Sequence, residues 1–244
     1  MSTLVIDIET VGEEWGDLDA ITQDTLLRWV KRTARNKDEE LALTTDVQAG
    51  LGFSPLTGKT VAIGLWDVER SQGAVYYTGE AGAEDEEFSG FILKQRNEYE
   101  MLNDFWQGAK QYHTFVTFNG RGFDIPFLVH RSIALGIRPT KNLLEGRYPY
   151  QQKSARHVDL QDELTFYGAM SKRPSLHLFC RAYGIKSPKQ EVSGDDVAEL
   201  FRQKKFRHIA EYNAADVIAT TELYQRWQEF LRPNDQAEEP SIHY

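Results

Sequence analysis

Short apolar runs bounded by turn residues recur along the chain and predict β-strands. The run at residues 4–8 is β-branched and apolar, which is typical of a buried central strand. Similar runs predict further strands at residues 61–66, 75–78, 114–118 and 158–160. We expect the first three strands to form an antiparallel meander.

Apolar positions at helical spacing predict the other elements. Residues 98–109 show the pattern clearly, with Tyr99, Leu102, Phe105 and Trp106 on one face. Three strands, then alternating helices and strands, then helices, indicate one α/β domain with a mixed sheet flanked by helices. Gly, Pro, Ser and Thr at 50–58 predict a connection. The predicted helices cover residues 20–37, 98–109, 125–135, 175–183, 195–203 and 206–231.

Two carboxylates interrupt the first apolar strand. Asp7 and Glu9 are two residues apart, so in a strand they point to the same side of the sheet. Like charges side by side in a buried strand raise each other's pKa unless a cation lies between them. This favours a metal role over two acids that merely face solvent. A haloacid-type phosphatase is discounted, because Glu9 stands where that chemistry needs a second Asp.

Asp124 follows the predicted strand 114–118 and precedes a predicted helix. Asp is a favoured N-cap residue, and Pro126 fits an early helical position, so a purely structural role is one interpretation. Gly120 and Gly122 allow the second interpretation, because a backbone that contains glycine can come close to a ligand. The strand–turn–helix step is also where open α/β sheets place ligands.

Tyr212 and Asp216 are four residues apart in the last predicted helix and therefore lie on one face. Their face also carries an apolar stripe, so it should point to the core. A buried carboxylate needs a partner. Either an Arg or Lys, or a metal shared with the first strand, would satisfy it, and the metal is favoured. The stripe consists of Ile209, Ala219, Leu223, Trp227 and Phe230.

Composition indicates an ordinary soluble globular protein, with 41% hydrophobic and 27% charged residues. Apolar runs stay short of the roughly 20 residues of a membrane span. The first residues lack the pattern of a signal peptide. Cys180, the single cysteine, lies in an apolar stretch and is predicted to be a core residue. A reducing, cytoplasmic setting is therefore expected.

The net charge of −9 argues against tight, non-specific coating of duplex DNA. It does not argue against a metal-dependent nuclease, because bound cations would neutralise several acids and would themselves contact phosphate. The acidic runs at 84–87 and 238–239 are expected to be solvated surface.

The three acidic segments, in this order, resemble the three exonuclease motifs of the DEDD (DnaQ-like) superfamily. More narrowly, they resemble the proofreading exonuclease domain of family B DNA polymerases and its stand-alone relatives. The resemblance runs from residue 4 to about residue 231, and Tyr212, with Glu211 rather than a histidine before it, is typical of the tyrosine branch. The segments are Val5-Ile6-Asp7-Ile8-Glu9-Thr10, Asn119-Gly120-Arg121-Gly122-Phe123-Asp124, and Tyr212 with Asp216.

This resemblance implies an RNase H-like fold and 3′→5′ exonucleolytic cleavage that releases nucleoside monophosphates. Asp7, Glu9 and Asp216 would hold one Mg²⁺ or Mn²⁺ ion. Asp7 would bridge to a second ion, which Asp124 would bind directly or through water. Tyr212 would orient the attacking water, since an ordinary tyrosine pKa near 10 makes a poor base at neutral pH.

The expected substrate is a single-stranded or frayed 3′ end, with DNA favoured over RNA. Thr10 and Asn119 are placed to contact the terminal sugar and phosphate, and Phe123 to stack on a base, whereas Phe118 and Phe127 are expected in the core. The nearest alternative is an exoribonuclease with the same chemistry, because the choice depends on how the 2′-hydroxyl is treated. A more remote alternative is a catalytically silent nucleic-acid-binding module.

The expected organisation is an exonuclease domain over residues 1–232 and a polar tail over 233–244. Residues 11–58 form a helical insertion near the active site, longer than the corresponding connection in polymerase domains. Its basic cluster either contacts the substrate strand or forms a solvated face. The chain lacks room for a polymerase palm, so a free-standing nuclease or a component of a complex is expected, with no membrane partner and unknown protein partners. The basic cluster is Lys31, Arg32 and Arg35.

Overall fold

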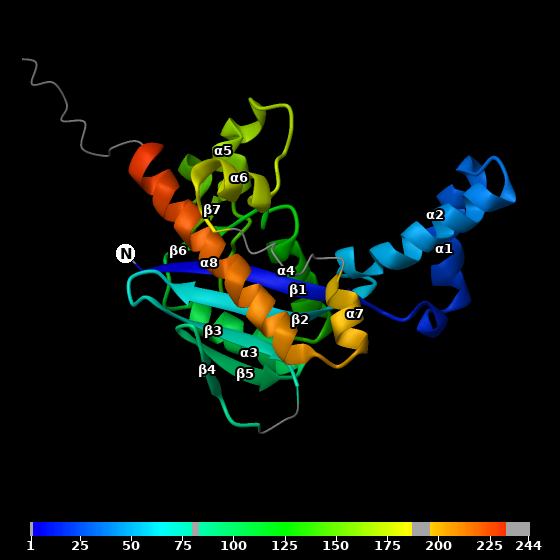
Figure 1. Ribbon diagram of the computed structural model, residues 1–244, viewed down its shortest axis with the longest axis horizontal. Coiled ribbons are helices and arrows are strands. Elements are labelled where there is room, and N and C mark those ends of the chain that lie inside the picture. The colour runs from blue at the N-terminus through cyan, green and yellow to red at the C-terminus, as the bar shows by residue number, and fades with distance from the viewer. Residues whose placement is uncertain (1, 80–82, 187–195, 233–244) are drawn as a thin grey trace, which may run out of the picture.

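A mixed seven-stranded β-sheet, in the order β4-β5-β3-β2-β1-β6-β7, forms the centre of the computed structural model, which describes residues 2–79, 83–186 and 196–232 (Figure 1). β1 pairs antiparallel with β2, and β2 with β3, which confirms the predicted meander. β6 runs parallel to both β1 and β7. The strands are β1 (Thr3–Gly12), β2 (Gly58–Asp67), β3 (Gln72–Thr78), β4 (Glu86–Phe88), β5 (Phe91–Arg96), β6 (Thr114–Thr117) and β7 (Arg156–Asp159).

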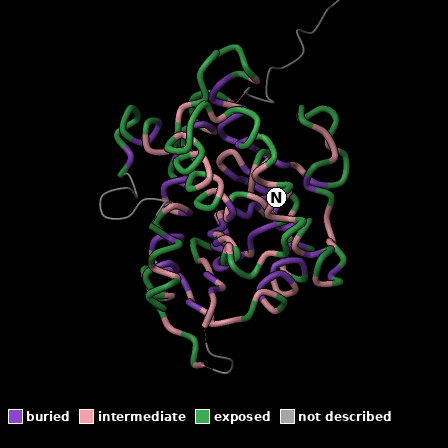
Figure 2. The backbone as a smooth tube through the Cα atoms, turned by 90° about the vertical axis from the view of Figure 1, so that its right-hand side faces the viewer, coloured by how far each residue is buried: buried purple, intermediate pink, exposed green. Residues whose placement is uncertain are grey.

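Helices cover both faces of the sheet, so the predicted α/β class is confirmed. In Figure 1, α8 lies across one face and α3 lies behind the strands. Figure 2 shows the buried backbone concentrated in the interior. The helices are α1 (Ala20–Thr33), α2 (Lys37–Ala49), α3 (Glu98–Ala109), α4 (Asp124–Ala134), α5 (Leu160–Leu164), α6 (Leu176–Tyr183), α7 (Val197–Arg202) and α8 (Phe206–Phe230), with 3-10 turns η1 (Trp15–Asp17), η2 (Gly50–Phe53), η3 (Pro149–Gln151) and η4 (Phe166–Gly168).

Alternation along β1 divides the core into two halves. Leu4, Ile6 and Ile8 pack with residues of α3 and α4 on one side of the sheet. Val5 and Val11 pack with residues of α8 on the other side. Because side chains alternate along a strand, Asp7 and Glu9 share the α8 side with Val5 and Val11.

Several details differ from the predictions. Tyr99 is 52% exposed and Phe230 67% exposed, so neither belongs to the apolar stripe of its helix. Cys180 is fully buried, as expected.

Strands β4 and β5 were not predicted, because β4 has three residues and β5 ends in Lys94-Gln95-Arg96. The predicted tail at 233–244 lies outside the described residues. None of the described helices is long and apolar enough to cross a membrane.

Acidic residues of the 84–87 run do more than face solvent. Asp85 forms an ion pair with Lys94 (Oδ2–Nζ 3.0 Å), and Glu86 with Arg207 (Oε2–Nε 3.4 Å). These pairs tie β4 to β5 and to α8. The expectation of a simply solvated run was therefore incomplete.

Helices α1 and α2 form a hairpin that extends away from the sheet at the end of β1 (Figure 1). A single helix over 20–37 was predicted, but the chain turns extended at Ala34, and Asn36 then caps α2 by accepting a hydrogen bond from the Glu39 N–H (2.9 Å). The apolar pattern of α2 is weak, because Leu41 is 68% exposed. In the basic cluster, Lys31 forms an ion pair with Asp24 (2.6 Å).

The hairpin returns to the sheet through η2, whose backbone touches the end of β1. A Cβ atom on Gly12 would lie 2.9 Å from the Gly52 nitrogen, and one on Gly52 would lie 2.9 Å from the Gly12 nitrogen. Glycine at both positions therefore permits this approach. The Thr10 hydroxyl also donates a hydrogen bond to the Gly52 carbonyl (2.7 Å), so η2 is held beside the strand that carries Asp7 and Glu9.

Candidate active site

The middle of β1 carries the first two carboxylates. Asp7 pairs with Gly64 and Glu9 with Ala62 in the antiparallel ladder with β2. The register shifts between Glu9 and Thr10. Such bulges bend a strand and re-aim its side chains, and they are common beside active sites. Glu9 itself is buried.

Helix α8 lies unusually close to β2 at this point. A Cβ on Gly64 would lie 2.4 Å from Asn213 Oδ1 and 2.7 Å from Val217 Cγ2. Only glycine therefore lets the helix approach so far. As a result, Asn213 Nδ2 donates a hydrogen bond to Asp7 Oδ2 (2.7 Å) across 206 residues of sequence.

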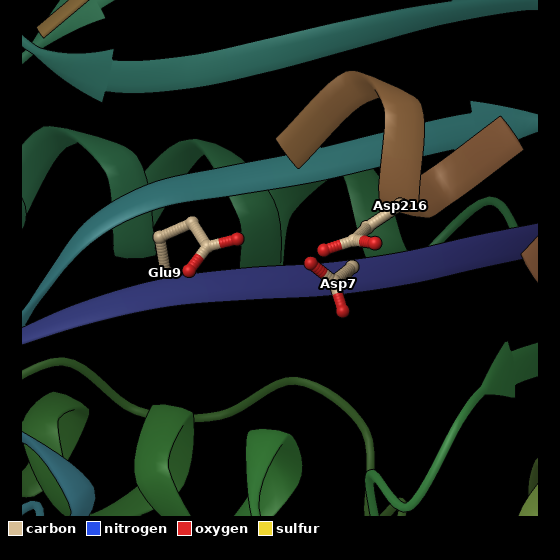
Figure 3. Close-up of side chains that lie close together, drawn as sticks. All are labelled: Asp7, Glu9 and Asp216. Atoms are coloured by element: carbon tan, nitrogen blue, oxygen red, sulfur yellow. The ribbon is translucent and has the colours of Figure 1, made fainter. Parts of the chain in front are cut away.

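Asp7, Glu9 and Asp216 form a carboxylate cluster (Figure 3). One oxygen of each lies within 4.8 Å of the others, and Asp216 points from α8 toward Asp7 on β1. Burial raises the pKa of Asp7 well above its usual value, and the charges of Asp216, Asp124 and Glu9 raise it further. Ionised carboxylates at this spacing repel one another, and a hard divalent cation bound by oxygen ligands would relieve that repulsion.

Asp124 is the first residue of α4 and does not cap it. Phe123 occupies the N-cap position, and no side chain caps the helix. Asp124 Oδ1 instead accepts a hydrogen bond from the Ile8 N–H on β1 (3.2 Å). Burial raises the pKa of Asp124 to about 7, despite hydrogen bonds that lower it. The structure thus contradicts the purely capping interpretation and places this carboxylate beside β1.

Asp159, which sequence reasoning did not select, shapes the loop before Asp124. Its two carboxylate oxygens accept hydrogen bonds from the N–H groups of Asn119 and Arg121, both at 2.9 Å. β7 is the parallel neighbour of β6, so its final residue lies next to the loop that leaves β6. A carboxylate that ends the neighbouring strand was the available signal.

Tyr212 faces the cluster from α8 and is buried. Burial raises the pKa of its phenol far above the usual value of 10, with smaller contributions from the charges of Asp216 and Glu9, and the phenol is hydrogen-bonded to Asp216. The phenol therefore stays protonated at neutral pH. In this state it is suited to donate a hydrogen bond rather than to accept a proton.

A cleft of about 210 Å³ brings these groups together. All eight site residues predicted from the sequence line it. Phe53 also lines it, although sequence reasoning missed this residue, and Phe118 lines it as well, although Phe118 was expected in the core. Phe127 is buried, as expected. The lining is Asp7, Ile8, Glu9, Thr10, Phe53, Phe118, Asn119, Phe123, Asp124, Tyr212 and Asp216.

Comparison with known proteins agrees with this architecture. The fold matches a family B DNA polymerase from the hyperthermophilic archaeon Pyrobaculum calidifontis, with a TM-score of 0.56, 17% identity, and coverage of 93% of this chain and 24% of that one. The mixed sheet and its flanking helices are thus an α/β fold that also occurs within a family B DNA polymerase. The family model described as "Predicted 3′-5′ exonuclease related to the exonuclease domain of PolB" matches residues 78–240, and the chain belongs to this family.

Two curated relatives are also DNA polymerases. DNA polymerase 1 of Saccharolobus solfataricus is 22% identical over 241 residues, which cover 89% of this chain and 26% of that protein. The DNA polymerase epsilon catalytic subunit of Arabidopsis thaliana is 27% identical over 156 residues, covering 58% of this chain and 7% of that protein. The chain thus matches about a quarter of the first relative and under a tenth of the second.

Proposed function

We propose that this protein is a metal-dependent 3′→5′ exonuclease that releases nucleoside monophosphates from single-stranded or frayed DNA 3′ ends. The observation that carries the proposal is the cluster of Asp7, Glu9 and Asp216 within 4.8 Å, in one cleft with Asp124 and Tyr212. Membership of a family related to the PolB exonuclease domain supports it.

The donor set fits two divalent cations. Every candidate ligand is a carboxylate oxygen, which Mg²⁺ and Mn²⁺ prefer. Asp7, Glu9 and Asp216 would hold one ion, while Asp7 and Asp124 would hold the other. When bound, such a pair of ions supplies Lewis-acid stabilisation of the attacking and departing oxygens of a phosphodiester.

The chain's own side chains would position the substrate. Tyr212 is protonated and hydrogen-bonded to Asp216, and its single O–H would turn from Asp216 to the attacking water once Asp216 holds a metal ion. Phe123 and Phe53 lie with ring centroids 6.4 Å apart at the cleft and would contact the terminal base. Asn119 lines the same cleft and would contact the terminal phosphate. The Thr10 hydroxyl is engaged by Gly52, so any contact from Thr10 to the sugar would have to share it.

DNA is the favoured substrate because both curated relatives are named as DNA polymerases. We propose that residues 1–232 form the exonuclease domain and that 11–58 is an insertion beside its cleft. Phe53, at the end of that insertion, supports its placement.

The test is hydrolysis of 5′-labelled single-stranded DNA and RNA of equal sequence, with Mg²⁺, with Mn²⁺ and then with EDTA. We expect DNA to shorten from its 3′ end and EDTA to stop the reaction. Glu9→Gln should lose activity and also lose the rise in Tm that Mn²⁺ gives the wild-type protein. Asp46→Asn, which changes an exposed carboxylate on α2, is the matched control and should behave as wild type. Faster loss of RNA would favour the exoribonuclease, and cleavage that persists in EDTA would refute the metal mechanism.

A further inference from the structure

Exposed tyrosine rings form a stack near β7. Tyr148 and Tyr150 lie with ring centroids 5.9 Å apart and planes 7° from parallel, and Tyr148 also packs on Tyr167 at 4.9 Å. Tyr150 is 81% exposed. The Tyr167 hydroxyl donates to Glu163 (2.7 Å), which fixes the inner ring. Rings held in a stack with one face open to solvent match the sequence-tolerant platforms on which nucleic-acid bases stack.

The backbone that carries Tyr167 adopts an uncommon conformation. Phe166 and Tyr167 have φ angles of 51° and 55°. The left-handed region is costly for bulky side chains, and such residues cluster at functional sites. Phe166 is 57% exposed beside the stack. The structure therefore keeps two successive aromatic residues in a strained turn at the surface.

Two arginines adjoin the tyrosine stack. Arg147 forms two hydrogen bonds with Asp162 (Nε–Oδ2 3.1 Å and Nη2–Oδ1 2.7 Å), and Arg173 approaches the same carboxylate at 3.5 Å. Their side chains are 51% and 55% exposed, whereas that of Asp162 is 5% exposed. One buried carboxylate thus orients two guanidinium groups, and the group retains positive charge. Residues 138–173 contain seven Lys or Arg and four Asp or Glu, in a chain with net charge −9.

A direct contact joins these arginines to the cleft. Arg173 Nη2 donates a hydrogen bond to Asn119 Oδ1 (3.3 Å), and Asn119 lines the cleft beside Asp124. From Asn119, hydrogen bonds and ion pairs lead through Arg173 and Asp162 to Arg147, which precedes Tyr148 in sequence. The basic and aromatic side chains therefore begin at the rim of the cleft and lead away from it.

We propose that Arg147, Tyr148, Tyr150, Tyr167 and Arg173 form an arginine–tyrosine surface that binds the single strand upstream of its 3′-terminal nucleotide. This inference rests on the proposed function for the direction of the strand. Guanidinium groups would contact phosphates, and the tyrosine stack would receive a base, so the ligand class is single-stranded nucleic acid. Such a strand would supply the negative charge that this patch complements.

Binding of fluorescently labelled single-stranded dT12 in EDTA, followed by anisotropy, tests the surface without catalysis. We expect Tyr150→Ala to weaken binding about tenfold, since it removes an open stacking ring. Tyr150→Phe keeps the ring and should stay within about twofold of wild type. Tyr99→Ala removes another exposed tyrosine, from α3, which packs mainly on β2, β3 and β5, and should also bind as wild type. Tyr150 is solvent-exposed, so the variants should fold, and equal Tm values would show it.

Unchanged binding by Tyr150→Ala, or no binding of dT12 by the wild-type protein, would overturn the inference. Either result would favour a protein as the ligand of this surface. The proposed function is tested separately by hydrolysis of the p-nitrophenyl ester of thymidine 5′-monophosphate with Mn²⁺, a substrate with no upstream nucleotide. A separate outcome is that the wild-type protein fails to hydrolyse this ester while its binding of dT12 still depends on the Tyr150 ring. That result would refute the proposed nuclease activity and would support the proposed strand-binding surface.

Discussion

Burial and three neighbouring carboxylates perturb the carboxyl group of Asp7 strongly. Its raised pKa means that the Asp7 carboxyl binds a proton more tightly in the folded protein than in the unfolded chain. The associated stability is fully present below pH 3.8 and is lost as the pH rises through the folded pKa. Without metal, the raised pKa of Asp7 therefore makes the fold less stable at neutral pH than at low pH.

We accordingly predict that metal-free Asp7→Asn melts a few degrees above the wild-type protein at pH 7.5 and level with it near pH 4. Mn²⁺ should reverse the order at pH 7.5, because only the wild-type cluster is intact. Activity should fall about 10³-fold, since a bound cation supplies several kcal/mol of transition-state stabilisation. Thermal unfolding with and without Mn²⁺ measures the first effect. A variant that melts below wild type in EDTA at both pH values would contradict the repulsion argument.

Tyr212 is predicted to matter as a hydrogen-bond donor. Tyr212→Phe should lower kcat about 10–100-fold, because it removes one hydrogen bond to a charged group and leaves every carboxylate in place. Because the phenol stays protonated, the pH–rate profile of the variant should keep the wild-type shape. A profile that loses a limb in the Phe variant would instead identify Tyr212 as an acid or base.

The sequence predicted the cleft residues well, because the strand and helix periods determine which carboxylates share a face. The sequence reasoning missed Phe53 and Asp159. Phe53 lies in η2, after α1 and α2, and no local sequence pattern predicts that η2 packs beside β1. Asp159 acts through two backbone N–H groups about 40 residues away in sequence. Both depend on tertiary contacts that periodicity does not encode.

At the scale of elements, the approach of α8 to β2 determines whether the cluster assembles. We predict that Gly64→Ala displaces α8, since its Cβ would overlap Asn213 and Val217. Overpacking costs about 1–3 kcal/mol, or roughly 3–10 °C in Tm for a domain of this size. Nuclease activity should fall further than stability, because Asp216 moves away from Asp7.

Gly108→Ala in α3 is the matched control for this change, because nothing lies within 4 Å of a Cβ there. It should be neutral or slightly stabilising. A Gly64→Ala variant with wild-type Tm and activity would mean that the added methyl group fits between β2 and α8 without displacing the helix.

Elements with weak patterns were the ones missed. α3 was predicted with its observed bounds, because Leu102, Phe105 and Trp106 mark its buried face at helical spacing. α2 packs mainly on α1 and η2, so it has few buried side chains to mark its period. β4 and β5 lie at the far edge of the sheet, where short polar strands are common.

For the whole molecule, the cleft's small volume predicts a preference for unpaired ends. The terminal nucleotide must leave a duplex to reach the carboxylates, and unpairing costs a few kcal/mol for matched ends and least for mismatched ones. We expect single-stranded and frayed 3′ ends to be degraded at least about tenfold faster than blunt ones. Substrates that differ only in terminal pairing measure this. Equal rates on blunt and single-stranded ends, or mononucleotides released first from the 5′ end, would be inconsistent with it.

The hydrogen bond between Asn213 and Asp7 spans 206 residues, so the cluster joins the start of the described chain to its last helix. Contacts of such sequence separation form late, because the intervening loop must close before they stabilise anything. A nascent chain on the ribosome would thus carry Asp7 and Glu9 on β1 long before α8 emerges with Asp216. The proposed hydrolytic capacity would arrive only after α8 has been synthesised, and a protease cut that releases α8 would remove it in a single step.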